Sequence, residues 1–542
     1  MMDVDNKESI TLCFDSGDKV ISEKSLLVKH SLYFEAMFRG QFLESRISGE
    51  IQLKDINHKG FVWILDYLKV KCITLESISE ILLLLETTQI LQFTEITKQC
   101  IQIVEKQFLF SACAIQIFSV AFKLDLHELY EKSRIYILYN FNVLTIHNRD
   151  EFFKLTVEDL YQLLCDNSLN VEKEIHVFDL VIEWCSKTGR EDIENEIAIA
   201  CVHFNTMDVS QLQYCLSKTN NFKLQNNIEQ YLHNKINGDN NDTIKSIRRV
   251  PIALCGIKNE DSGHAYIYYW DWNQMKFIKF LQLDPLPLDT TGYHVVVKGM
   301  DIFVLAGEIG YGKGQWNEAG WKYNMINKQW SQLENFTTTK RRHGVGYFCG
   351  NELYLFGGLT KHRLPNELME RFILSEDQRE LKRVRSYLCN FTKKVDRKIY
   401  TCLEFKGQLV MITKERNPVW FYLCHNKIDP SLCDWGSRPL HLNAIIICAT
   451  NYFDSIYLLA YNDQLNITLY CYCPVDESCE DVVNFKAVYD QDSTMCSFNG
   501  NKAMVFTNNV LECYNVDNKK YREYPIHLDL FHSNYFFNIP IY

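Results

Sequence analysis

The spacing of apolar residues divides the chain into a helical first half and a strand-like second half. In residues 150–185, apolar side chains recur every three or four positions, which predicts two consecutive helices. Thr156 is the expected N-cap of the first helix and Asn170 that of the second. The second helix has an apolar stripe wide enough to be surrounded by other helices, formed by Ile175, Val177, Phe178, Val181, Ile182, Trp184 and Cys185.

The first hundred residues combine both periods. Short runs at 11–14 and 19–21 flank an Asp-Ser-Gly-Asp turn and predict a hairpin, with a further strand at 50–53. Helices are expected at 25–38, 58–68, 75–87 and 93–108. We therefore predict a mixed α/β domain in residues 1–108 and an all-α domain in residues 109–247. A polar, turn-rich segment at 237–242 is the expected linker to the rest of the chain.

From about residue 249 apolar residues alternate, and the pattern repeats. The clearest copies are HVVVKGMDIFVLAGE and HGVGYFCGNELYLFGG. A period of roughly 40–55 residues is typical of propeller blades. The count predicts six divergent blades in residues 249–542, with residues 534–542 supplying a strand that the first blade lacks. The repeat is carried by one aromatic position of the third strand, at Trp270, Tyr323, Phe372, Tyr422, Tyr472 and Tyr514, and in three units by a second aromatic seven residues later, at Phe277, Trp330 and Tyr521.

Composition narrows the function classes. The 542 residues carry a net charge of −11, which argues against general nucleic-acid binding, and no apolar run is long enough to span a membrane. The sequence has 20 cysteines but no Cys-x-x-Cys, and its start lacks the pattern of a signal peptide. Free thiols in a reducing compartment are therefore expected, in the cytoplasm or alternatively the nucleus.

Candidate chemistry is sparse. No phosphate-binding loop, nucleophile elbow or zinc-protease motif occurs, so we expect a non-catalytic protein without cofactor or metal. Cys471, Cys473 and Cys479 could form a thiolate site, but the alternation around them favours thiols buried in a strand. Basic residues gather at Arg341, Arg342, His343 and Arg363, in predicted inter-strand loops. These loops could form a basic rim that binds an acidic peptide of a protein substrate, the alternative being solvated loop charge.

Three stretches resemble known modules. SLLVKHSLYFEAMFRGQFLESRISGEIQLKDINHKGFVWILDYL is similar to a BTB domain, an α/β module of protein association. Residues 150–185 are similar to a BACK domain, the helical spacer that follows BTB in kelch-like proteins. The repeats resemble a kelch propeller, with the double glycine clearest at Gly357-Gly358. The whole order resembles the kelch-like substrate adaptors of cullin-3 ubiquitin ligases.

The resemblance implies partners and residues. Phe42, Leu43 and Glu44 fall on the hydrophobic-x-Glu positions that contact the cullin-3 scaffold in kelch-like adaptors. The propeller would then bind an unknown protein substrate. The amino-terminal elements that many BTB dimers exchange have almost no room before Thr11, so homodimerisation is left open. The main rival is a non-degradative kelch scaffold, for instance one associated with the cytoskeleton.

Overall fold

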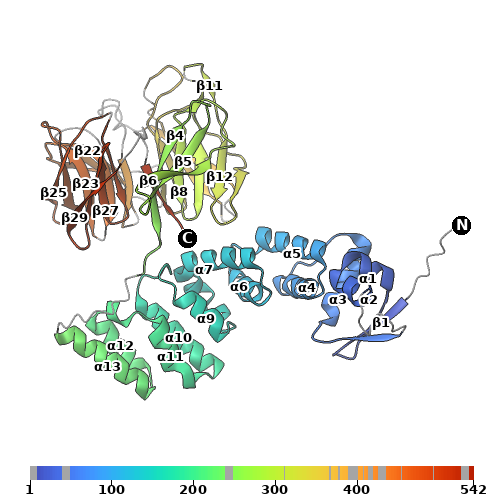
Figure 1. Cartoon of the computed structure of the whole chain (residues 1–542). Helices are drawn as coiled ribbons and strands as arrows, with labels where there is room; N and C mark the ends of the chain where they lie inside the picture. Colours follow the sequence, from blue (N-terminus) through green and yellow to red (C-terminus); the bar gives the residue numbers. More distant parts are fainter. Residues whose placement is uncertain are drawn as a thin grey trace. The chain divides into compact units, whose positions relative to one another are not determined.

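The chain divides into two compact units, residues 1–250 together with Tyr542, and residues 251–541 (Figure 1). The computed structural model describes residues 9–39, 49–237, 248–310, 312–364, 366, 368–375, 379–388, 401–406, 408–412, 419–424, 435–452, 454–491, 493–526 and 536–542.

The first unit begins with a three-stranded sheet covered by helices. Its strand order is β2-β1-β3, with β1 antiparallel to β2 and parallel to β3. The sheet and helices share one core, in which Leu12, Phe34, Phe61 and Ile81 are fully buried or nearly so. The elements are β1 (Ser9–Phe14), β2 (Lys19–Glu23), α1 (Lys24–His30), α2 (Leu32–Arg39), β3 (Glu50–Leu53), α3 (His58–Val70), α4 (Ile78–Ile90) and α5 (Thr94–Gln107).

The helix predicted at 25–38 is wrong in one respect, because it is broken at Ser31 into α1 and α2. Ser31 has an extended backbone, and its hydroxyl donates to the Leu91 carbonyl at 2.6 Å while accepting from the Phe34 N–H at 3.0 Å. The serine therefore caps α2 and ties it to the end of α4. The apolar spacing continues across the break, which is why periodicity alone could not reveal it.

The rest of the first unit is helical and builds a second core around Trp184, Phe178, Phe141 and Leu163. Its helices are α6 (Ala114–Lys123), α7 (His127–His147), α8 (Arg149–Phe152), α9 (Val157–Leu164), α10 (Glu174–Thr188), α11 (Glu194–Cys201), α12 (Val209–Lys218) and α13 (Phe222–Asn237), with short 3-10 turns η2 (Glu191–Ile193) and η3 (Phe204–Thr206). None of the helices in the described part of the chain is long and apolar enough to cross a membrane.

The predicted caps of the central helix pair had different outcomes. Thr156 caps α9 as expected: its hydroxyl accepts from the Asp159 N–H at 3.1 Å, and Asp159 accepts from the Thr156 N–H at 3.3 Å. Asn170 does not cap α10, whose N-cap is Lys173 without a side-chain bond. The Asn170 amide instead donates to the Tyr139 carbonyl of α7 at 2.7 Å. The helix begins three residues later than predicted, and Asn170 makes a tertiary hydrogen bond instead of a cap.

The second unit is an antiparallel six-bladed propeller with divergent repeats. Six four-stranded sheets are present in the described residues, each with strands in chain order side by side except where β30 joins β4 and where β9 pairs with β12 across β10 and β11. A small sheet of β7 (Thr290–Thr291), β10 (Glu308–Ile309) and β11 (Gln315–Trp316) lies among the loops. The blade strands are β4 (Ile252–Asn259), β5 (Ala265–Asp271), β6 (Lys276–Gln282), β8 (His294–Lys298), β9 (Asp301–Leu305), β12 (Gly320–Asn324), β13 (Gln329–Gln332), β14 (Val345–Cys349), β15 (Glu352–Phe356), β16 (Leu368–Leu374), β17 (Leu381–Leu388), β18 (Thr401–Phe405), β19 (Gln408–Ile412), β20 (Val419–Cys424), β21 (Trp435–Leu440), β22 (Ile445–Tyr452), β23 (Ser455–Tyr461), β24 (Asn466–Cys473), β25 (Ser478–Val488), β26 (Met495–Asn499), β27 (Lys502–Phe506), β28 (Val510–Asn515), β29 (Lys520–Pro525) and β30 (Phe536–Pro540).

The ring is closed by the end of the chain, as predicted. β30 pairs antiparallel with β4 from Phe536–Gly256 to Pro540–Ile252, and so becomes the first strand of the opening blade. The first strands of five successive blades contact one another in the order β8, β14, β18, β22 and β26. The opening blade completes the ring, because its strand β4 contacts β26 and its strand β30 contacts β8. As far as the described strands go, each blade therefore has another blade on either side.

Candidate functional site

The predicted basic residues lie on two loops at one edge of the propeller. Residues 341–343 belong to the connection from β13 to β14, and Arg363 to the connection from β15 to β16. In a ring of four-stranded antiparallel blades, these two kinds of connection lie at the same edge. The structure brings them together: the Arg342 N–H donates to the Leu359 carbonyl at 3.1 Å, and the Leu359 N–H returns a bond of 2.8 Å.

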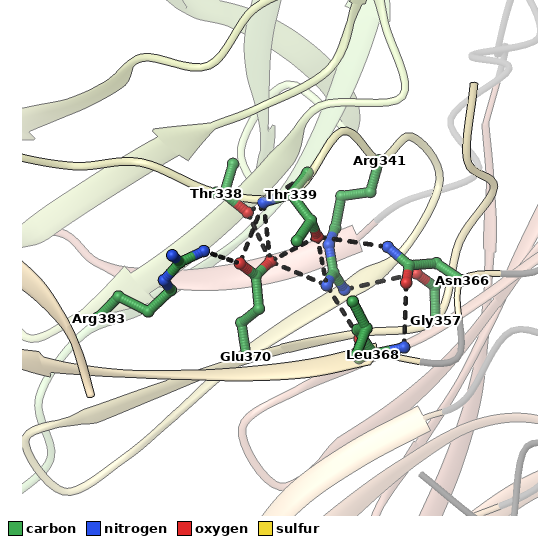
Figure 2. A network of polar contacts seen from close by, with 8 residues as sticks. All are labelled: Thr338, Thr339, Arg341, Gly357, Asn366, Leu368, Glu370 and Arg383. Carbon is green, nitrogen blue, oxygen red and sulfur yellow. Dashed lines mark hydrogen bonds and ion pairs between the residues drawn. The ribbon is translucent and has the colours of Figure 1, made fainter. Parts of the chain in front are cut away.

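Arg341 lies inside the blade, with an exposed fraction of 0%. Figure 2 shows its guanidinium between the loop and the third strand, where it pairs with Glu370 at 2.9 Å and donates to the Leu368 carbonyl at 2.9 Å. The same carboxylate accepts from the Thr338 hydroxyl at 2.7 Å and the Thr339 N–H at 3.0 Å. Burial raises the pKa of Glu370, but Arg341 and these donors outweigh it and hold the pKa below its usual value.

Arg342 is also buried, with an exposed fraction of 3%, and forms an ion pair with Glu308 of β10. Glu308 additionally accepts from the Gly314 N–H at 3.0 Å. Burial opposes ionisation of Glu308, yet the glycine N–H groups and Arg342 hold its pKa below the usual value. The ion pair joins the β13–β14 loop to the small sheet of β7, β10 and β11.

The prediction of a basic rim therefore needs correction in part. Arg341 and Arg342 are buried and ion-paired in the structure, so their charge is matched inside the fold rather than displayed on a loop. His343 and Arg363 are exposed, and both have a left-handed backbone, with φ of 55° and 59°. No observation tests whether any of the four contacts a substrate, and that role stays a prediction.

His294, the first residue of β8, adds no charge to this edge. Its side chain is 1% exposed and packs against Gly344, whose position would place a β-carbon 2.9 Å from the imidazole Cε1. Burial, followed by the positive charge of Arg341, lowers the pKa of His294 to about 3. The ring is therefore neutral at physiological pH.

A hollow of about 270 Å³ opens at the same edge of the ring. Its lining comes from the β4–β5 connection, the β6–β8 connection and the β9–β12 connection. Charged groups of both signs face it, because Glu260, Asp289 and Lys313 are all part of the lining. The hollow is thus a mixed-charge surface built from loops of the first two blades, with the size of a few side chains.

The predicted cullin-contacting residues Phe42, Leu43 and Glu44 lie outside the described residues, which resume at Gly49 after Arg39. Their predicted role is therefore untested. The helix that precedes them, α2, ends at Arg39 and buries Phe34 and Phe38 in the core.

Sequence reasoning missed the carboxylates that pair with the loop arginines. A signal was available, because Glu370 stands inside the apolar run of β16, and Glu308 comes three residues after the end of the apolar strand β9. A carboxylate in such a run has to be paired when the strand is buried. The sequence contains many carboxylates, however, and nothing in it says which arginine meets which one.

Metal and thiolate chemistry can be tested for the described residues. Among them, no group of three or more His, Cys, Asp or Glu side chains is arranged to hold a metal ion. Cys471 and Cys473 lie on β24 and Cys479 on β25, all partly buried and without disulfide bonds. Burial, followed by the nearby Asp481, raises the pKa of the Cys479 thiol to about 11. That shift disfavours the thiolate, in line with strand packing.

Comparison with known proteins identifies two modules in the first unit. The family profile described as BTB/POZ domain matches residues 5–108, and the profile described as "BTB And C-terminal Kelch" (BACK) matches residues 114–217. The chain is 28% identical over 198 residues to Kelch repeat and BTB domain-containing protein 8 of Danio rerio, a match covering 36% of this chain and 32% of that relative. The chain thus spans about a third of the length of the curated relative it matches.

Proposed function

We propose that this chain, which belongs to the kelch-like family of BTB–BACK–kelch proteins, is the substrate-recognition adaptor of a cullin-3 RING ubiquitin ligase. Proteins of this architecture are typically non-catalytic adaptors or scaffolds, and their BTB domains generally mediate cullin-3 binding and dimerisation. The observation that carries the proposal is the order of modules: a BTB match, a BACK match, then a closed propeller.

The proposed mechanism is tethering. The BTB domain holds the cullin, the propeller edge holds a protein substrate, and the ligase's own ubiquitin-loaded partner performs the chemistry. The rate gain then comes from effective concentration and orientation, so no residue of this chain has to act as an acid, base or nucleophile. We place this activity in the cytoplasm, with the nucleus as the second possibility, because the described cysteines are free thiols, as is usual in a reducing compartment.

Fewer residues are available to bind a substrate, because Arg341 and Arg342 are held in ion pairs inside the fold. The positive charge that is exposed on the β15–β16 loop comes from Lys361 and Arg363. An acidic peptide would meet these side chains, together with His343 on the neighbouring loop. Because the ion pairs between the peptide's carboxylates and these side chains would lie at the surface, binding should weaken as ionic strength rises.

A pull-down of cullin-3 with the full chain tests the adaptor proposal. Wild type should capture the cullin, and the double substitution Phe42→Ala/Glu44→Ala should reduce capture at least tenfold, because it removes an apolar anchor and its neighbouring carboxylate. Val70→Ala is the matched control, since it truncates an exposed apolar side chain at the end of α3. Failure of the wild-type chain to capture any cullin would refute the ligase role and leave the scaffold role.

A further inference from the structure

Two cysteine thiols meet in the helical part of the first unit. Cys165 directly follows α9 and Cys201 is the last residue of α11, and their Sγ atoms are 3.6 Å apart. The two helices pack against each other, and both are labelled in Figure 1. The Cys165 thiol also approaches the Ala200 carbonyl at 3.6 Å, so its sulfur lies over the end of α11.

The two thiols differ sharply in access to solvent. Cys165 is exposed, whereas Cys201 has an exposed fraction of 0%. Among the cysteines that the structure describes, only Cys72 is also exposed. An oxidant in solution therefore reaches Cys165 first and finds a second thiol already in contact behind it. A pair of this kind, with an accessible thiol and a nearby resolving thiol, is what reversible thiol oxidation requires.

The position of the pair is fixed by Arg248, a buried residue that follows the linker. Its guanidinium donates to the Leu164 carbonyl at 2.6 Å and the Asp166 carbonyl at 2.8 Å, on either side of Cys165, and it also bonds the Cys201 carbonyl. Glu174 holds the same guanidinium from α10, with an N–O distance of 2.7 Å. One side chain thus binds the backbone at both cysteines, which keeps the thiols together and raises their effective concentration.

We propose that Cys165 and Cys201 are a peroxide-reactive dithiol that closes to a reversible disulfide. The Cys165 sulfur attacks one oxygen of hydrogen peroxide, the O–O bond breaks, and a sulfenic acid and one water form. The Cys201 sulfur then attacks the Cys165 sulfur, the S–O bond breaks, and a second water leaves with the thiol proton. Each sulfur gives up one electron, and the two electrons reduce one peroxide to two waters. A small thiol reverses the reaction by exchange.

The disulfide would lock α9 to α11. Its two ends are 36 positions apart in the sequence, so the cross-link closes a loop that the unfolded chain would otherwise leave free. The expected consequence is a first unit that resists unfolding better when oxidised. Oxidation of this pair requires neither the cullin nor the substrate, because both thiols lie in the helical part of the first unit.

The experiment uses the full chain, reduced, freed of reductant and treated with equimolar hydrogen peroxide. After alkylation of the remaining thiols, peptide mapping by mass spectrometry should find a Cys165–Cys201 cross-linked peptide that is 2 Da lighter than the two free peptides, as loss of two hydrogens requires. The melting temperature of the first unit should rise by a few degrees and return after treatment with dithiothreitol.

Variants separate this site from general cysteine oxidation. Cys165→Ser and Cys201→Ser should each abolish the cross-link and the melting shift, while Cys72→Ser, the control at the other exposed described cysteine, should leave both unchanged. Should Cys201→Ser fold poorly, Cys165→Ser suffices, because its side chain is exposed. The proposal is overturned if peroxide drives Cys165 to a sulfinic or sulfonic acid with Cys201 still reduced, or if Cys165 links to a different cysteine.

Discussion

At the scale of single residues, the buried pair Arg341–Glu370 shows why charge in a loop sequence is a poor guide to binding. Both side chains have exposed fractions of 0%, and the carboxylate is shared with Arg383, whose side chain is 45% exposed. Glu370 has a lowered folded-state pKa, so its contribution to stability is complete above the unfolded value and is lost as pH falls through the folded value. The pair is thus an acid-sensitive internal bond.

Substitution of the two arginines that pair with Glu370 should reduce the stability of the propeller by different amounts. Arg341→Met leaves Glu370 buried without its matching charge, and we expect the free energy of unfolding of the propeller to fall by about 3–5 kcal/mol. Arg383→Met removes an exposed partner at 3.3 Å and should cost less than about 1 kcal/mol. Urea unfolding followed by tryptophan fluorescence measures both. Equal costs would contradict the buried-pair interpretation.

At the scale of elements, the seven-residue aromatic spacing was predictable because it reflects local geometry. Trp270 pairs directly with Phe277, Tyr323 with Trp330 and Tyr514 with Tyr521, each across the hairpin of the third and fourth strands. The four-residue turns end in a left-handed residue, at Met275, Lys328 and Lys519. A turn of fixed length and shape sets the spacing of the two aromatic residues, so the repeat can still be recognised in blades that have lost the double glycine.

Elements whose ends depend on distant partners were less predictable. The helix break at Ser31 depends on a hydrogen bond to the Leu91 carbonyl, and the Asn170 amide donates to the Tyr139 carbonyl. Neither partner is a sequence neighbour, so local rules for capping could not identify it. The partner of a loop arginine is equally distant in the sequence, since Arg341 and Glu370 are 29 positions apart. Sequence therefore predicted the modules and repeats well, and the partners of polar side chains poorly.

The residue that directly follows the second strand of one blade, β9, has an unusual backbone conformation that can be tested. Ala306 precedes Gly307 where another blade has Gly357-Gly358, and it has φ of 58°. A left-handed backbone costs a residue with a β-carbon about 1–2 kcal/mol. We expect Ala306→Gly to be neutral or stabilising in a thermal unfolding experiment, because relief of this strain offsets the lost methyl group and the added flexibility of glycine.

The control for that variant is another buried alanine. Ala503 lies inside strand β27, is 0% exposed and has no left-handed backbone to relieve. Ala503→Gly should therefore lower the melting temperature of the propeller by several degrees, as expected for a loss of about 1–2 kcal/mol. If the two substitutions destabilise the protein equally, the strain at Ala306 is negligible.

At the scale of the whole molecule, stability of the propeller depends on the last strand. β30 supplies the first strand of the opening blade, Ile539 is 0% exposed, and the Asn538 amide donates to the Phe498 carbonyl of the last blade at 3.0 Å. β30 also contacts β8 of the next blade. One short segment therefore joins three blades, and without it β4 would present an unpaired edge.

Deleting residues 534–542 should consequently open the ring. We expect the propeller to lose its cooperative thermal transition and to become sensitive to limited proteolysis, because β4, β8 and β26 each lose a neighbour that covers apolar surface. Removal of Tyr542 alone, which leaves the β30 pairing with β4 intact, is the matched control and should preserve the transition. If the longer deletion melts like the full chain, closure by β30 is not what holds the blades together. A loss of the transition that is confined to the longer deletion is due to the strand itself, since the two variants differ only in residues 534–541, which include β30.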